Sequence, residues 1–291
     1  MYLADQWLDY ELIDAGSGEK LERWGKVILQ RPDPQAIWPH DPWPAPDALY
    51  HRSQTGGGYW QKNRPHPAVW EIKYPGACGD LTFRIEPTGF KHTGLFPEQA
   101  PNWDFCGRSI SSAVASGRQA QILNLFAYTG GATVACAAAG ATEVVHLDAS
   151  KGMNARAREN LALSGQSDSL VRFFTDDAQK FVEREARRGR KYDGIIMDPP
   201  AYGRGPSGEL WQLEDALYGL VERCAALLSD QPLFFLINSY TTGLAPTVLT
   251  DVLNLAVKKI HGGRAEASEL GLQATSRDLV LPCGCTGRWQ P

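Results

Sequence analysis

Several features that define other protein classes are missing from this sequence of 291 residues. No apolar run approaches the roughly 20 residues that a membrane-spanning helix needs. The first residues are acidic and lack the basic and apolar segments of a signal peptide. Six cysteines are present, but none forms the C-x-x-C pair that is common in structural zinc sites. These absences predict a cytoplasmic protein with reduced cysteines, no bound metal and no membrane contact.

A strong excess of positive charge is also missing. The formal net charge of −4 provides no overall basic field for nucleic acid. Local patches decide such binding, so RNA is not excluded. The content of 43% hydrophobic and 21% charged residues is typical of a globular protein, and the length allows one large domain or two small ones.

Residues 1–99 are predicted to form a small β-rich domain. Tryptophan and proline are concentrated between Trp38 and Pro46, and the alternating segments 9–13 and 26–29 predict strands. Basic residues alternate with aromatic ones, as on surfaces that stack bases and neutralise phosphates. A thin core built by tryptophan, with basic residues in solvent, explains the same pattern. RNA contact by this domain is therefore a hypothesis.

The irregular segment 87–99 follows a predicted strand at 80–86. A loop just before a core domain often covers one end of its sheet, which would place Lys91, His92 and Phe96 near a ligand. A plain connection between two domains explains the segment equally well.

Residues 100–291 alternate between strand-type and helix-type segments. Strands are predicted at 121–126, 143–147, 170–174, 194–197 and 233–237, with a closing pair at 265–270 and 278–281. Helices are predicted at 101–116, 132–139, 151–163, 178–187, 210–228 and 247–258. The alternation predicts an α/β fold with a Rossmann-like, doubly wound, seven-stranded and mostly parallel sheet. Ligands of such sheets bind at the carboxyl ends of the strands.

The stretch 121–150 places a glycine turn between a strand and a helix, and an acid after the next strand. The turn runs from Tyr128 to Gly131, and the acid is Asp148. Glycine allows a close backbone approach, and a helix N-terminus offers unpaired N–H groups. An acid at the strand end can accept the hydroxyls of a ribose. The pattern is not G-x-G-x-x-G, and an ordinary tight turn also explains it.

Two further acids follow predicted strands, Asp177 and Asp198. Acids at successive strand ends are poor core residues, so they favour a ligand site. Two prolines follow Asp198, remove two backbone donors and leave acceptors facing the crevice. Tyr202 can stack on a planar base. A stiff turn without a ligand is the alternative.

Five motifs in order carry a family resemblance: NLFAYTGG, the acid of HLDAS, RENLALSG, the TDDA turn and DPPAYG. Together they resemble the class I S-adenosylmethionine-dependent methyltransferases. More closely, they resemble the branch with the bacterial 23S rRNA methyltransferases of the 5-methylcytosine and 7-methylguanine kinds. The segment GFKHTGLFPEQ is similar to that branch's K-T-G-F-F-x-D-Q segment, and the resemblance covers roughly residues 80–285. No PUA-like domain is recognisable, which differs from several members.

The resemblance implies S-adenosylmethionine as cofactor and large-subunit rRNA, or its assembly particle, as partner, with no DNA expected. Asp148 would bind the ribose, and Asp177, with Asp176 as the alternative, would hold the adenine amino group. The predicted cofactor site comprises Phe126, Tyr128, Thr129, Gly130, Gly131, Asp148, Ala149, Asp177, Ala178 and Asp198. The predicted catalytic residues, which face the target base, are Asp198, Pro199, Pro200, Tyr202 and Asn238.

The positions of the cysteines distinguish between the possible target atoms of the methylation. Methylation at C5 of cytosine requires a cysteine thiolate that first adds to the neighbouring ring carbon. Ala201 and Tyr240 occupy the two places where the branch carries it, and Cys224, Cys283 and Cys285 lie elsewhere. Guanine N7 already has an in-plane lone pair and needs only positioning. We therefore rank guanine N7 first, exocyclic amines second and cytosine C5 third. A small-molecule or protein methyltransferase and a non-catalytic RNA-binding factor remain alternatives.

Overall fold

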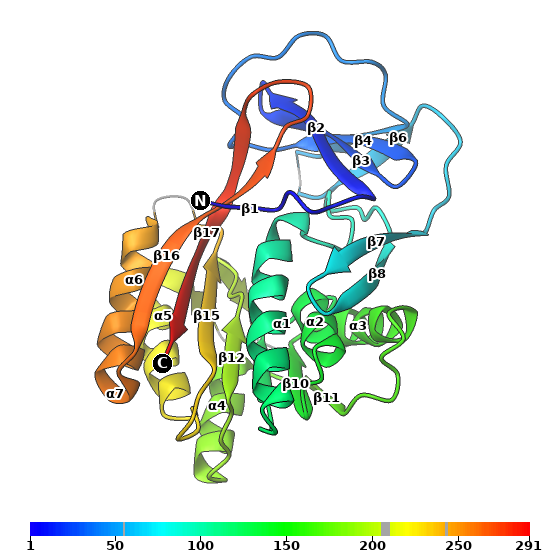
Figure 1. Cartoon of the computed structure of the whole chain (residues 1–291). Coiled ribbons are helices and arrows are strands. Elements are labelled where there is room, and N and C mark those ends of the chain that lie inside the picture. The colour runs from blue at the N-terminus through cyan, green and yellow to red at the C-terminus, as the bar shows by residue number, and fades with distance from the viewer. Residues whose placement is uncertain (55, 205–209, 242–243) are drawn as a thin grey trace. The chain divides into compact units, whose positions relative to one another are not determined.

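The computed structural model describes residues 1–54, 56–204, 210–241 and 244–291 (Figure 1). Its contacts divide the chain into two compact units. Unit 1 comprises Met1–Gly76, Asp80–Pro101 and Leu270–Cys283. Unit 2 comprises Ala77–Gly79, Asn102–Glu269 and Gly284–Pro291. The division into domains 1–99 and 100–291 stays a prediction, and it did not anticipate that residues 270–283 belong to unit 1.

Unit 1 contains a five-stranded sheet of order β2-β3-β4-β5-β6 and a two-stranded sheet, β7-β8. Its strands are β1 (Tyr2–Leu3), β2 (Tyr10–Gly16), β3 (Glu19–Trp24), β4 (Val27–Pro32), β5 (Ala48–Arg52), β6 (Gly58–Lys62), β7 (Trp70–Gly76) and β8 (Gly79–Ile85). Ser17 and Gly18 connect β2 to β3 with φ values of 52° and 80°, which is the geometry of a tight hairpin turn. The segments predicted at 9–13 and 26–29 lie in β2 and β4 or at their ends, and β3 between them was missed.

Unit 1 has a charged centre. Glu22 is fully buried and accepts hydrogen bonds from the Tyr10 hydroxyl at 2.8 Å and from Nη2 of Arg31 at 2.9 Å. Arg31 and Lys20 lower the pKa of Glu22 to about 2, although burial alone would raise it. A buried carboxylate of this kind is stable only because its charge is paired.

The sheet of unit 2 has the order β16-β17-β15-β12-β9-β10-β11, and β1 joins its edge by pairing parallel with β16 at Leu270 and Gly271. The strands are β9 (Gln121–Leu125), β10 (Glu143–Asp148), β11 (Val171–Thr175), β12 (Gly194–Met197), β15 (Phe234–Ser239), β16 (Arg264–Gln273) and β17 (Val280–Gln290). The four central pairings are parallel, and β17 runs antiparallel to β15. The predicted doubly wound, mostly parallel class is confirmed, with eight strands rather than seven because β1 joins the edge.

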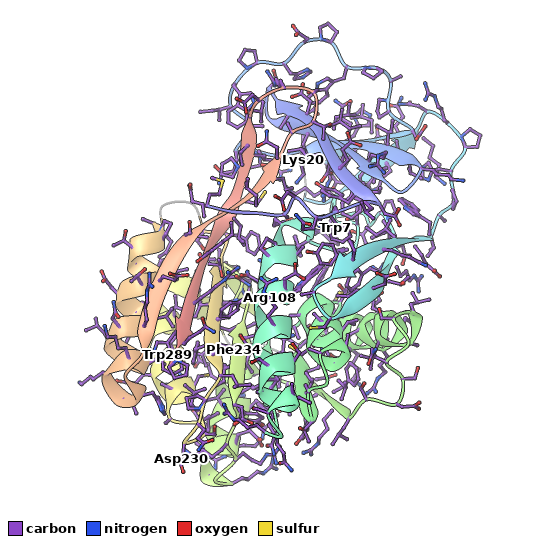
Figure 2. The ribbon with its side chains drawn as sticks, viewed as in Figure 1. Trp7, Lys20, Arg108, Asp230, Phe234 and Trp289 are labelled. Carbon is purple, nitrogen blue, oxygen red and sulfur yellow. The ribbon has the colours of Figure 1, made fainter. Side chains whose placement is uncertain are left out.

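Helices cover both faces of this sheet (Figure 1). They are α1 (Ala100–Ala115), α2 (Gly131–Ala138), α3 (Lys151–Leu163), α4 (Ala178–Arg187), α5 (Leu213–Ala225), α6 (Pro246–Leu253) and α7 (Lys259–His261). Neighbouring residues of β9 divide between two cores: Leu123 and Leu125 pack with α4, α5 and α6, whereas Ile122 packs with α1 and α2. Phe234 and Trp289, labelled in Figure 2, are buried in these opposite cores.

Two predicted helices are wrong at their ends. Residues 210–212 form strand β14 (Leu210–Gln212), which pairs antiparallel with β13 (Tyr202–Arg204), and the helix begins at Leu213. The helix predicted at 247–258 is regular only in α6, and Asn254–Lys258 forms a π-helical turn. Among the described residues, no helix has the length and apolar character to cross a membrane.

Candidate functional site

The turn after β9 has an unusual backbone. Phe126 and Tyr128 adopt φ values of 56° and 51°, a left-handed region that side chains with a Cβ rarely occupy. Gly130 follows with a φ of 85° and caps the N-terminus of α2. Strained residues of this kind persist where the surrounding structure fixes them, and they cluster at ligand sites.

Asp148, at the end of β10, fixes this turn. Its Oδ2 accepts the Tyr128 N–H at 2.9 Å, and its Oδ1 accepts the Ser150 N–H at 2.8 Å. Burial raises the pKa of the carboxyl group, while the two N–H donors act in the opposite direction. A partly buried acid oriented by backbone donors has lone pairs left for a ligand hydroxyl.

The two glycines of the turn are required by packing inside unit 2. A Cβ on Gly130 would lie 2.9 Å from the Ala157 Cβ, and one on Gly131 would lie 2.7 Å from the Trp103 ring. The carbonyl of Thr129 accepts a hydrogen bond from Nδ2 of Asn160 at 2.8 Å. Helix α3, which carries Ala157 and Asn160, therefore presses directly against the turn.

Buried polar side chains of β9, α2 and β10 form a hydrogen-bonded group next to the same turn. Oγ1 of Thr133 on α2 accepts from Nδ2 of Asn124 at 2.9 Å and is hydrogen-bonded to Nδ1 of His146 at 2.8 Å. His146 is fully buried in β10. Burial, together with the positive charge of Arg158, lowers the pKa of His146 to about 3. The imidazole is thus a neutral hydrogen-bonding group at neutral pH.

A cavity of about 90 Å³ lies at the carboxyl ends of β9, β10, β11 and β12. Its lining consists of Phe126, Leu147, Asp148, Ala149, Asp176, Asp177, Ala178, Pro200, Gly203 and Trp211. The predicted cofactor residues Phe126, Asp148, Ala149, Asp177 and Ala178 therefore come together. The volume is smaller than the roughly 300–1,000 Å³ of typical ligand pockets, so this cavity fits only part of a nucleotide-sized ligand.

Other predicted residues lie outside this lining. They are Tyr128, Thr129, Gly130, Gly131, Asp198, Pro199, Tyr202 and Asn238. Their roles stay predictions. The same holds for Lys91, His92 and Phe96, which belong to unit 1 and whose position near a ligand stays untested.

The two neighbouring acids after β11 differ in their bonds. Oδ1 of Asp177 caps α4 by accepting the Lys180 N–H at 2.9 Å. Asp176 accepts the Asp177 N–H at 2.8 Å with one oxygen and pairs with Arg184 through the other. Both carboxylate oxygens of Asp176 therefore already have partners within the protein. This favours Asp177 as the acceptor for a ligand amino group.

Trp211 is a lining residue that sequence reasoning missed, because residues 210–212 were assigned to a helix. Its Nε1 donates to the Pro200 carbonyl at 2.6 Å, and its ring lies 5.2 Å from that of Phe126. The bond ties β14 to the turn after β12. A lone tryptophan eleven residues after the last proline of the D-P-P turn was the available signal.

Tyr202 and Asn238 occupy different surroundings. Tyr202 is 59% exposed and directly precedes the cavity-lining Gly203 in β13. Asn238 is buried, and its Oδ1 accepts from Nδ2 of Asn102 at 2.9 Å. Oδ1 of Asn102 in turn accepts from Nη2 of Arg288 at 2.7 Å. Asn238 thus belongs to a buried network.

The cavity suits an adenosine-type ligand. Phe126, Leu147 and Trp211 provide apolar walls for a flat ring, while Asp148 and Asp177 provide acceptors for hydroxyl and amino groups. The charged side chains among the described lining residues are the acids Asp148, Asp176 and Asp177, which favour a ligand that carries positive charge. These properties match S-adenosylmethionine better than a dinucleotide.

Fold and site together define a doubly wound α/β domain for a nucleoside-type ligand. Residues 49–243 match the family model described as S-adenosylmethionine-dependent methyltransferase. The chain belongs to this family, and its cofactor is S-adenosylmethionine.

Three relatives illustrate the similarity. A solved S-adenosylmethionine-dependent methyltransferase from Agrobacterium tumefaciens is 34% identical, with a TM-score of 0.92, and the match covers 100% of this chain and 93% of that one. Ribosomal RNA large subunit methyltransferase I of Tolumonas auensis is 32% identical over 69% of this chain and 48% of that protein. Methyltransferase K/L of Syntrophotalea carbinolica is 34% identical over 54% of this chain and 20% of that protein. The chain spans about half or less of these two curated relatives.

Proposed function

We propose that the protein is an S-adenosylmethionine-dependent methyltransferase of large-subunit rRNA that acts on a base nitrogen, with guanine N7 favoured. The cavity that joins Asp148 and Asp177 to the apolar walls is the observation that carries the cofactor part. The names of the curated relatives support rRNA as the substrate class.

The side chains of this chain would act mainly by binding and orientation. Asp148 would hold the ribose, Asp177 the adenine amino group, and Phe126 and Trp211 the faces of the adenine ring. The cofactor supplies an electrophilic methyl group. The turn Asp198-Pro199-Pro200 would present acceptors to the target base, and the exposed Tyr202 would stack on that base. Orientation of this kind is worth roughly 7–11 kcal/mol when it is well achieved.

Guanine N7 fits this set because it carries no proton that a base would need to remove. Methylation of an exocyclic amine also requires no covalent adduct between base and enzyme. The Asp198 side chain and the Pro199 carbonyl could align such an amine. Cytosine C5 fits less well. None of the described residues that line the cavity is a cysteine, and burial raises the pKa of the Cys224 thiol.

The test is a nucleoside analysis. The purified protein is incubated with labelled cofactor and 23S rRNA from a strain that lacks the gene, and the digested RNA is analysed by mass spectrometry. We expect one new 7-methylguanosine. If a methylated adenosine or 5-methylcytidine forms instead, the methylated atom of that nucleoside becomes the assigned target in place of guanine N7. Methyl transfer to metabolites or proteins, with none to RNA, would overturn the RNA assignment.

A substitution of Tyr202 tests the proposed contact with the target base. Tyr202→Ala should lower turnover about 5- to 150-fold, because base stacking is worth about 1–3 kcal/mol, while cofactor affinity stays within about 2-fold. Tyr218→Ala, which removes another exposed tyrosine of unit 2, is the matched control. Equal turnover of the two variants would remove Tyr202 from the target site.

A further inference from the structure

The β5–β6 hairpin ends the five-stranded sheet of unit 1. Strand β6 pairs with β5 and is the last strand in the order, so it is an edge strand. Five residues connect the two strands, and Gly56 and Gly57 adopt φ values of 94° and 67°. A Cβ on Gly58 would lie 2.1 Å from the His51 carbonyl oxygen. The sequence of three glycines is thus required to close this hairpin.

One face of the hairpin is fastened within unit 1. Tyr50 and Trp60 are cross-strand partners whose rings pack edge to face at 5.3 Å. The Tyr50 hydroxyl donates to the Gly89 carbonyl at 2.9 Å, and Nε1 of Trp60 donates to the Thr88 carbonyl at 2.8 Å. These bonds hold the segment 87–91 against the hairpin.

The opposite face presents a supported aromatic ring. Tyr59 is 63% exposed, and its ring stacks on that of His51 at 5.1 Å with an angle of 29°. Nε2 of His51 donates to Oε1 of Gln61 at 2.8 Å, so His51 is itself fixed. An exposed ring held in one orientation loses little conformational entropy when a second flat ring stacks on it.

The exposed cations of the hairpin lie at its two ends, and strand alternation places Arg52 and Lys62 on the face of Trp60 and not on that of Tyr59. Residues 48–70 contain Arg52, Lys62 and Arg64 but no aspartate or glutamate. All three cations are exposed, and among the residues the structure describes only Arg64 has an acidic partner, Asp47 at 3.6 Å. The hairpin is therefore locally basic although the whole chain has a net charge of −4.

A second exposed ring lies at the turn. Phe90 is 70% exposed, and one of its ring carbons would lie 3.5 Å from a Cβ on Gly57. Its neighbour Lys91 lies near other cations: burial first, and then Lys20, Arg31 and Arg52, lower the pKa of Lys91, whereas Asp33 acts in the opposite direction.

We propose that the β5–β6 hairpin, an exposed sheet edge, binds a single-stranded segment of the RNA substrate, with a base stacked on Tyr59 and the flanking phosphates reached by the exposed Arg52 and Lys62 at the two ends of the hairpin. The proposal rests on the proposed function, since RNA is the substrate class there. Aromatic rings interleaved with cations are the arrangement that unpaired nucleotides recognise, because every base offers a flat face and every linkage a negative charge. Paired bases in a duplex cannot reach the ring, so single strands are preferred.

The test measures binding of a fluorescent 12-nucleotide single-stranded RNA, and of the same sequence as a duplex, to the full chain. We expect the single strand to bind more tightly, and Tyr59→Ala to weaken it about 5- to 150-fold, which corresponds to about 1–3 kcal/mol. Tyr218→Ala, with an exposed tyrosine of unit 2, should leave the affinity unchanged.

Charge and cofactor measurements separate the possible outcomes. Arg52→Gln with Lys62→Gln should reduce the slope of log affinity against log salt by about 1.4, since each single-strand phosphate contact contributes roughly 0.7. Calorimetry with S-adenosylmethionine should give the wild-type affinity for every hairpin variant. Unchanged RNA affinity in folded Tyr59→Ala, or equal binding of the duplex, overturns the hairpin site even if the wild-type protein methylates rRNA. Absence of any RNA methylation by the wild-type protein contradicts the proposed function instead.

Discussion

The Tyr128 N–H donates a hydrogen bond of 2.9 Å to Oδ2 of Asp148 and so ties together the ends of β9 and β10. The neighbouring Ala127 N–H donates to the Leu147 carbonyl at 3.0 Å. This pair of bonds holds Tyr128 in its left-handed conformation, so the acid that faces the cavity also stabilises the turn beside it. Asp148 therefore has a structural role in the turn in addition to the binding role proposed for it.

Asp148→Ala should weaken S-adenosylmethionine binding by at least about 1.5–3 kcal/mol, the cost of losing hydrogen bonds to a charged acceptor. Calorimetry with the cofactor or its demethylated product measures this directly. Asp148→Asn keeps an oxygen acceptor and should lose less. Asp230→Ala, at the exposed aspartate labelled in Figure 2, is the control and should bind normally. Wild-type affinity in a folded Asp148→Ala variant would remove Asp148 from the site.

Trp211→Phe should weaken cofactor binding by roughly 0.5–1.5 kcal/mol, because it keeps an aromatic wall but loses the bond to the Pro200 carbonyl. Trp211→Ala should have a larger effect, since it also removes the wall. The matched control is Trp60→Phe, which breaks an equivalent tryptophan–carbonyl bond in unit 1. Equal cofactor affinity in Trp211→Phe, Trp211→Ala and the control would show that the ring does not contact the cofactor.

The fold of unit 2 was largely predictable because strand and helix periods alternate clearly there. Helix α3 and strand β12 begin and end where the sequence pattern placed them. Strand β14 was not predictable, because Leu210–Gln212 continues into a helix-forming segment. Its extended form depends on pairing with Tyr202–Arg204 and on the Trp211 bond to Pro200, which are tertiary contacts that override local propensity.

The position of a residue at a strand end predicted the cavity lining only in part. Asp148, the last residue of β10, and Asp177, two residues after β11, line the cavity, whereas Asp198, directly after β12, does not belong to the described lining. Asn238 also ends a strand, but Asn102 and Arg288 form a network around it that only the folded chain reveals. The glycine turn was recognised, but its physical reason differs: Ala157 and Trp103 fill the space where a Cβ would lie.

His146 should make unit 2 less stable in acid. Its folded-state pKa of about 3 lies below the ordinary value of 6.5, so the unfolded chain binds the proton more readily. The free energy of unfolding should therefore fall as the pH decreases from about 6.5 toward 3, by up to about 1.4 kcal/mol per pH unit from this residue.

Urea unfolding at several pH values checks this dependence. His146→Gln, which keeps hydrogen-bonding groups but cannot titrate, should show a shallower loss of stability over the same range. An NMR titration of the His146 ring in the folded protein gives a second readout. A midpoint near pH 6.5 would contradict the prediction.

Methylation should not require a cysteine. Ala201 and Tyr240 occupy the two places where a nucleophile would lie. Cys224 and Cys285 are buried, and burial raises the pKa of the Cys285 thiol to about 11. A thiol of this kind is almost entirely protonated at neutral pH, and the thiolate is the nucleophile.

Replacement of Cys224, Cys283 and Cys285 by serine should therefore leave the methylation rate within a few-fold of wild type, provided that circular dichroism shows a folded protein. Single variants identify any folding defect, which is most expected at the fully buried Cys224 because a serine hydroxyl there needs a partner. RNA containing 5-fluorocytosine offers an independent readout, since a cysteine enzyme would become covalently attached to it. A trapped adduct on wild-type protein, or an inactive but folded triple variant, would return cytosine C5 to first place.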